Sequence, residues 1–126
     1  MLITLLILTI LSLLQPQTKD GATMEFEHLN HNFGTLIQGS PKVTHEFEFT
    51  NNGVAPLLVT RTTTSCKCIH ISAPKRPIRK GEKGKIVVSY DPKDVGVFNK
   101  SIEIHANIEG KVLTLFVTGE VVGKKK

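Results

Sequence analysis

From Met24 onward, apolar and polar residues alternate along the chain with a period of two. The clearest case is residues 43–49, where Val43, Phe47 and Phe49 fall on one side of an extended chain and polar residues occupy the other. Such alternation is typical of strands that bury one face against a core. No window shows a sustained helical stripe bounded by capping residues. The pattern therefore predicts an all-β domain.

Turn-forming clusters divide this pattern into about seven short strands. The expected strands cover residues 24–28, 43–49, 57–61, 66–71, 86–90, 98–105 and 112–121. Two of the turns between successive strands are Asn51-Asn52-Gly53 and residues 91–96, and both are rich in residues that favour turns. Many short strands at regular spacing predict a β-sandwich or a barrel. The inward positions predict these core residues: Phe47, Phe49, Val88, Ile102, Ile104, Leu115 and Val117.

The N-terminal residues break the alternation. Residues 2–14 are apolar apart from Thr4, Thr9 and Ser12, and a polar run follows as far as Thr23. A membrane span needs about 20 apolar residues, so this segment better fits the apolar part of a secretory signal peptide. No Lys or Arg precedes it and no clear cleavage site follows, which leaves an uncleaved anchor or a buried segment as alternatives.

We therefore divide the chain into three parts. Residues 1–23 are expected to be a signal peptide or N-terminal anchor with a short polar linker, 24–123 the folded domain, and 124–126 a lysine tail. The leader predicts export, to the periplasm or to the cell surface and beyond. It also predicts that any membrane contact is made through an uncleaved N-terminus.

The charge distribution argues against a nucleic-acid partner. Between Met24 and Gly123, twelve Lys and Arg oppose ten Asp and Glu, which leaves a net charge of only +2. The one basic stretch, residues 67–85, holds seven Lys and Arg against Glu82 and contains no aromatic residue. Binding of single-stranded nucleic acid usually combines a basic groove with stacking aromatics. We interpret this stretch as a solvated loop.

Residues 66–70, Cys66-Lys67-Cys68-Ile69-His70, form the one motif with chemical content. Residues two apart in an extended strand point the same way, so Cys66, Cys68 and His70 would share a face. Three interpretations stay open: a disulfide between Cys66 and Cys68, a soft-metal site for copper(I) or zinc that adds His70, and two buried thiols. Export favours the disulfide. A regular strand opposes it, because it places such residues about 6.5–7 Å apart and a bridge would need a bend.

No set of residues predicts catalysis. The chain shows no phosphate-binding glycine loop, no zinc-protease helix motif and no spacing typical of a thiol hydrolase. His28, His31, His45 and His105 are scattered, and a single histidine in a strand is more often structural than a ligand. We therefore predict that the chain is not an enzyme and uses no cofactor.

The sequence also resembles a known family. The residues that carry the resemblance are Phe33-Gly34-Thr35-Leu36, Gly39, Phe47-Glu48-Phe49-Thr50-Asn51, Gly53, Pro56-Leu57, Ser65-Cys66-Lys67-Cys68, Pro74, Pro77-Ile78, Gly81-Glu82-Lys83-Gly84, Tyr90-Asp91-Pro92, Gly96, Phe98-Asn99-Lys100 and Leu115-Phe116-Val117-Thr118-Gly119. Over roughly Phe26 to Val122 the chain resembles the bacterial family called domain of unknown function 1573, which is similar to Hydin-type and major-sperm-protein-type immunoglobulin-like domains. The family usually has Gly where this chain has Lys67, so a role that needs positive φ there is in doubt.

The resemblance implies an immunoglobulin-like antiparallel β-sandwich in an exported protein, and it implies no reaction. The leading hypothesis is an exported binding or scaffolding module that recognises an unknown protein or cell-envelope component through a strand edge or end loops. The rival hypothesis is a thiol-redox or copper-handling protein that uses Cys66 and Cys68.

Overall fold

The computed structural model describes residues 21–124 and forms eight strands and no helix within them. The strands are β1 (Glu25–Phe26), β2 (Asn30–Ile37), β3 (Val43–Thr50), β4 (Val59–Thr64), β5 (Ile69–Ser72), β6 (Lys83–Tyr90), β7 (Gly96–Ala106) and β8 (Val112–Val122). The predictions for the leader and for the last two lysines lie outside the described residues. Within 21–124 there is no helix long and apolar enough to cross a membrane.

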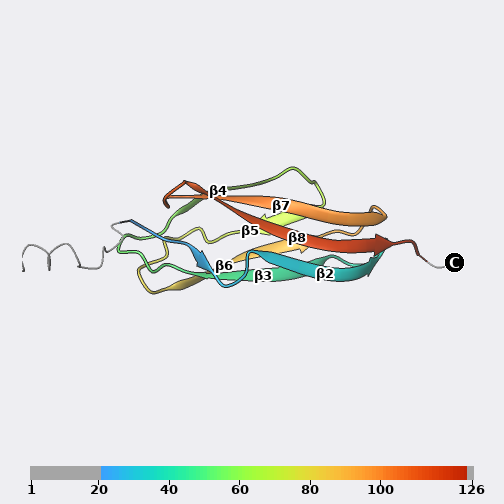
Figure 1. The fold of residues 1–126 in the computed structure, drawn as a ribbon, viewed down its shortest axis with the longest axis horizontal. Helices are drawn as coiled ribbons and strands as arrows, with labels where there is room; N and C mark the ends of the chain where they lie inside the picture. The colour runs from blue at the N-terminus through green and yellow to red at the C-terminus, as the bar shows by residue number, and fades with distance from the viewer. Residues whose placement is uncertain (1–20, 125–126) are drawn as a thin grey trace, which may run out of the picture.

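The strands form two four-stranded sheets that pack face to face (Figure 1). One sheet has the order β1-β3-β6-β5 and the other the order β2-β8-β7-β4. All neighbours are antiparallel except β2 and β8, which are parallel. This arrangement is the immunoglobulin one, with the first strand divided between the sheets as β1 and β2. The predicted fold class is confirmed.

The pattern of alternation missed β2. Its register against β8 shifts between Asn32 and Thr35, and Gly34 within that interval has a φ of 75°. A bulge of this kind inserts an extra residue and moves the next side chains to the opposite face. The period of two is therefore lost in the middle of the strand, although β2 is eight residues long.

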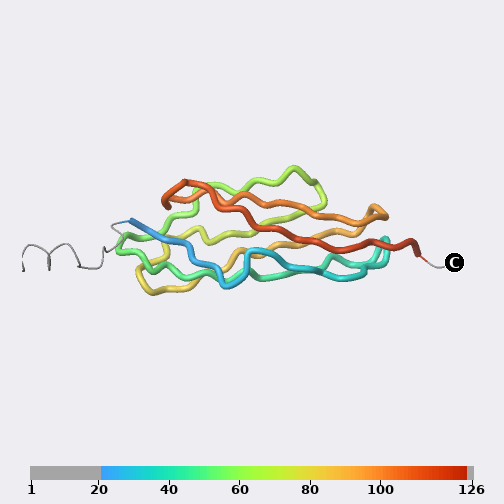
Figure 2. The backbone as a smooth tube through the Cα atoms, in the orientation of Figure 1, coloured from blue at the N-terminus to red at the C-terminus, as the bar shows by residue number. Residues whose placement is uncertain are grey.

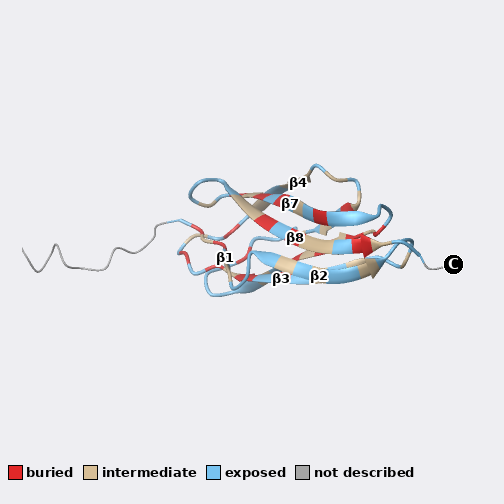
Figure 3. Cartoon of the chain, turned by 45° about the vertical axis from the view of Figure 1, so that its right-hand side comes forward, coloured by how far each residue is buried: buried red, intermediate tan, exposed pale blue. Residues whose placement is uncertain are grey.

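The core lies between the two sheets, where the inward side chains meet. All seven residues predicted for it are buried, with at most 2% of each exposed. Buried and exposed segments alternate along β7 and β8, as the period of two requires (Figure 3). Burial of one such large apolar side chain contributes about 1.5–3 kcal/mol, so this alternation is the main source of stability. A contact between the sheets is the stacked pair Tyr90 and Phe98, with ring centroids 3.9 Å apart.

The two ends of the sandwich have different constituents (Figure 2). Gly21, the first described residue, lies at one end. Next to it, Ala22 forms a β-bridge with Ile108 in the turn between β7 and β8. The loop 73–82 between β5 and β6 lies at this end too, because it precedes the start of β6. We call it the N-terminal end. At the far end lie the C-terminus, the turn between β6 and β7, and residues 66–68.

Candidate functional site

Cys66 and Cys68 are joined by a disulfide in the structure. They lie in a turn between β4 and β5, not in the strand expected over residues 66–71. The backbone N–H of Ile69 donates to the carbonyl of Cys66 at 3.2 Å, which closes the turn. The turn brings the two Cα atoms to 5.2 Å, within the usual range for a bridge. The geometric objection raised from the sequence therefore does not apply.

The turn also changes the two other expectations for this motif. Lys67 does not have a positive φ, so replacing the family's usual glycine costs no backbone strain here. His70 lies in β5 opposite Ser89 of β6, and no group of three or more His, Cys, Asp or Glu within residues 21–124 could hold a metal ion. The structure does not assemble Cys66, Cys68 and His70 as ligands. The expectation that they share the face of one strand was wrong, because the cysteines precede that strand.

Asn51 is the feature that sequence reasoning missed. Its side chain is fully buried. The Oδ1 atom accepts the backbone N–H groups of Thr23 and Gly53, both at 3.0 Å. The Nδ2 atom donates to the carbonyls of Ala55 at 2.9 Å and Ile78 at 2.8 Å. One amide thus satisfies four backbone groups at the N-terminal end, and the hydrogen-bonding capacity of a buried polar group is fully used.

The backbone of Asn51 extends the same connection. Its N–H donates to the carbonyl of Glu82 at 3.0 Å, and its carbonyl accepts the N–H of Gly81 at 2.6 Å. Gly53 packs so closely on the backbone of Gly21 that a Cβ there would overlap it. Residues 21–23, loop 51–55 and loop 73–82 therefore form one tied group. The sequence signal was only a turn-forming Asn-Asn-Gly, which is usually exposed.

Two of the histidines that looked scattered meet between the sheets. The rings of His31 in β2 and His45 in β3 stack with centroids 3.6 Å apart, and Phe33 and Phe47 contact their edges. Desolvation lowers the pKa of His31. Desolvation, followed by the charge of His31, lowers the pKa of His45. The row closes the side of the sandwich formed by β2 and β3.

The outer face of the sheet that contains β3 and β6 is internally paired. We define this paired face by Thr44, Glu46, Glu48, Lys83, Lys85 and Ser89. Lys83 contacts Glu48 at 3.3 Å, Lys85 contacts Glu46 at 3.0 Å, and the Thr44 and Ser89 hydroxyls are 3.0 Å apart. The hydrogen bond and the charge of Glu46 raise the pKa of Lys85. Its polar groups have partners within the face, in the manner of cross-strand pairs.

Within residues 21–124, the outer face of the other sheet is paired only on its β4 side, where Thr63 and His105 contact Glu103, and a more open region lies across the remaining strands. We define this open face by the five residues that line a shallow hollow across β2, β8 and β7: Asn30, Asn32, Asn99, Phe116 and Thr118. Phe116 is 41% exposed at the centre of β8. No side-chain hydrogen bond joins Asn30 or Asn99 to another residue in the described part of the chain. The face thus presents an aromatic ring and free amides without a charged group in the lining.

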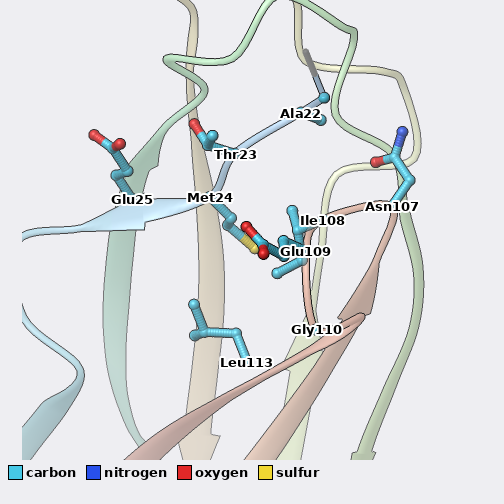
Figure 4. Close-up of a pocket in the computed structure, with 10 residues that line it drawn as sticks. Ala22, Thr23, Met24, Glu25, Asn107, Ile108, Glu109, Gly110 and Leu113 are labelled. Carbon is cyan, nitrogen blue, oxygen red and sulfur yellow. The ribbon is translucent and has the colours of Figure 1, made fainter. Parts of the chain in front are cut away.

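A second hollow lies at the N-terminal end, between residues 21–25 and the turn 107–110 (Figure 4). The side chains of Met24, Ile108 and Leu113 gather on its inner side, while Glu25 points away from them. Among the described residues, the only ionisable ones that line it are Glu25 and Glu109, and no metal-binding set lies there.

The fold makes the chain an immunoglobulin-like antiparallel β-sandwich. It matches the family "Protein of unknown function (DUF1573)" over residues 24–121, and it belongs to that family. The resemblance drawn from the sequence is confirmed. No curated protein matches the chain.

Three solved structures show the same fold at low sequence identity. A protein of unknown function from Porphyromonas gingivalis W83 has 18% identity and a TM-score of 0.69, with 85% of this chain and 50% of that chain covered. PapD-like domain 7 of human CEP192 has 12% identity and a TM-score of 0.70, covering 89% and 94%. WR4, a major-sperm-protein family member of C. elegans, has 9% identity and a TM-score of 0.52, covering 79% and 97%. The chain thus spans half of the Porphyromonas protein.

Proposed function

We propose that this chain is an exported, non-catalytic binding domain that recognises another protein or a cell-envelope component through its open face. The contrast between the two outer faces carries the proposal. Side chains on the paired face satisfy one another, whereas the open face keeps Phe116 exposed and leaves the Asn30 and Asn99 amides free to bind. Protein interfaces are enriched in aromatic residues and depleted in charge at their centres.

The edge of the same sheet supports a protein partner. Within residues 21–124, β4 pairs with β7 on one side only, so its other edge offers unpaired backbone groups. A hollow lined by Thr63, Thr64, Ser65, Ser101 and Glu103 adjoins this edge. An extended segment of a partner could add to β4 by backbone hydrogen bonds and extend the sheet, while another part of the partner contacts the open face. Recognition through a strand edge is the mode that the sequence led us to expect, and we keep it as part of the proposal.

Site-specific photo-crosslinking in the native host tests the proposal. A photoreactive residue at Asn99 should give discrete crosslinked products, because that position lies on the open face. The matched control places it at Glu46, which is exposed on the paired face, and should give few. Equal crosslinking from both positions would contradict the assignment. Intact mass of the same purified protein would test export, since a cleaved leader shortens the chain.

A thiol-redox role is the second candidate, favoured by a disulfide that lies partly exposed in a turn. So short a ring adds little stability, which frees the bridge to open and close without unfolding the domain. In freshly isolated exported protein, thiol counting before and after mild reductant should show no thiols and then two. Two free thiols at the outset would exclude the bridge, and metal analysis for copper and zinc would then decide between a metal site and plain buried cysteines.

A further inference from the structure

Loop 73–82 carries a concentration of positive charge on a fixed backbone. The side chains of Lys75, Arg76, Arg79 and Lys83 line a hollow of about 520 Å³, together with one carboxylate, that of Glu82. Lys83 is paired with Glu48, whereas Lys75, Arg76 and Arg79 make no ion pair with any carboxylate in residues 21–124. The sequence suggested an ordinary solvated loop. The structure instead gathers these basic side chains around one hollow and leaves three of them without an ion pair among the described residues.

The backbone of this loop is anchored and not free. Ile78 exchanges two backbone hydrogen bonds with Leu57, both of 2.8 Å, and also accepts from the side chain of Asn51. Pro74 and Pro77 further restrict the segment. The cationic side chains are therefore held together at the N-terminal end of the sandwich, so binding an anion there costs little backbone ordering.

The same end carries exposed apolar side chains and the beginning of the described chain. Val54 is 49% exposed and Leu58 is 42% exposed, and both belong to the segment that is hydrogen-bonded to Ile78 or Asn107. Thr23 is bonded to Asn51, so the chain reaches the sandwich beside the basic loop. The sequence run of residues 2–14, which is nearly all apolar, lies only seven residues before Ala22.

We propose that loop 73–82 and Val54 dock the N-terminal end of the sandwich onto anionic phospholipid headgroups. Basic side chains near a negatively charged leaflet are attracted to it, and adjacent apolar side chains insert at its boundary. The surface is separate from the open face, which runs along the sheet, so docking would leave that face accessible. The domain would stand on the membrane by its N-terminal end. This inference adds a second membrane contact to the one expected from an uncleaved N-terminus.

Partition of the full chain onto vesicles tests the docking. The probe is phosphatidylcholine vesicles with and without 30% phosphatidylglycerol, at low salt, and the readout is the ratio of the two partition coefficients. Residues 1–20 are present in every variant, so their own contribution cancels in comparisons between variants. Arg76→Gln with Arg79→Gln should reduce the ratio roughly 30-fold if both side chains face the leaflet. The control, Lys42→Gln with Lys93→Gln, also removes two positive charges, but at the far end of the sandwich. It should leave the ratio nearly unchanged.

Tryptophan fluorescence shows which end of the domain contacts the membrane, and this result does not depend on the net charge of the variant. The chain has no tryptophan, so Val54→Trp and Val95→Trp each introduce a single reporter at an exposed valine, one at each end. Phosphatidylglycerol vesicles should shift the emission of the Val54→Trp protein to shorter wavelength and leave that of the Val95→Trp protein unchanged. The proposal would be overturned if both double variants lost partition equally, or if both tryptophan reporters shifted equally. It would also be overturned if the wild type showed no preference for phosphatidylglycerol. So would binding to a soluble sulfated polysaccharide that depends on Arg76 and Arg79 without any preference for the anionic vesicles.

Discussion

Two regions at opposite ends of the sandwich join the same strand to its surroundings by different means. At the start of β6, the buried amide of Asn51 ties residues 21–23, loop 51–55 and loop 73–82 together. At its other end, the carbonyl of Cys68 accepts the N–H of Asp91, and a covalent bridge joins Cys68 to Cys66. The covalent link closes a ring of three residues, whereas the amide bonds residues up to 28 positions away from Asn51 in the sequence.

The comparison indicates that the sequence separation of the linked segments matters more for the stability of the fold than the strength of the linking bond. A cross-link stabilises a fold mainly by restricting the unfolded chain, and a three-residue ring restricts it little. Removing a buried amide leaves several backbone groups without partners inside the protein, and each such group costs about 1–3 kcal/mol. We therefore expect the uncharged, non-covalent region to be the more important of the two for stability.

The largest effect is expected for Asn51→Ala. The substitution leaves the N–H groups of Thr23 and Gly53 and the carbonyl of Ala55 without the Asn51 partner, and the carbonyl of Ile78 keeps only Leu57. The free energy of unfolding should therefore fall by about 3 kcal/mol or more. Urea unfolding measures it. Asn52→Ala is the matched control, because Asn52 is exposed and Glu25 is the one residue among 21–124 that its side chain bonds. If the two variants lose equal stability, the burial of Asn51 is not what matters.

A smaller effect is expected from opening the disulfide. The loop-closure expression gives at most about 1.6 kcal/mol for a ring of three residues. Cys66→Ser with Cys68→Ser, or the reduced protein, should remain folded and lose less stability than Asn51→Ala. Thermal melting of the oxidised and reduced forms measures the difference. Unfolding on reduction would reverse the comparison and make the bridge a structural link.

The histidine stack is expected to give a still smaller, pH-dependent effect. The folded-state pKa values of His31 and His45 lie below the ordinary 6.5, so below about pH 6.5 the unfolded chain binds more protons than the folded one. Stability is complete above that pH and declines as the pH falls through the folded pKa values. Glu46 opposes this decline and His28 adds to it. Both rings are partly exposed, so solvent screens the effect.

Melting temperatures at pH 7.5 and pH 5.5 isolate the contribution of the histidine stack to stability. They are compared between the wild type and the double variant His31→Gln with His45→Gln. The wild type should lose more on acidification than the double variant does. An equal loss would assign the acid sensitivity to other groups, and the stack would then be a packing contact alone.

The sequence predicted what depends on local periodicity and missed what depends on contacts between distant segments. Phe47, Ile102 and Leu115 were recognisable as core residues because a strand repeats every two residues. Cys66 and Cys68 matched the same period and were wrongly placed in a strand, because a turn can carry the same spacing. The burial of Asn51 and the contact between His31 and His45 require two loops or two sheets to meet, and no spacing along the chain encodes that.

Only a small effect on stability is expected on the open face, where the change should appear in binding instead. Phe116→Thr places a β-branched residue in β8 between Thr114 and Thr118, so the strand conformation is retained. Because Phe116 is 41% exposed, its loss should lower the free energy of unfolding by only about 1 kcal/mol. Crosslinking from Asn99 in the same protein should nevertheless fall, since the aromatic ring at the centre of the hollow is gone. A loss of stability comparable to Asn51→Ala would mean that Phe116 packs as a core residue. Retained crosslinking in a stable variant would place the partner elsewhere and leave the unpaired state of this face without a functional explanation.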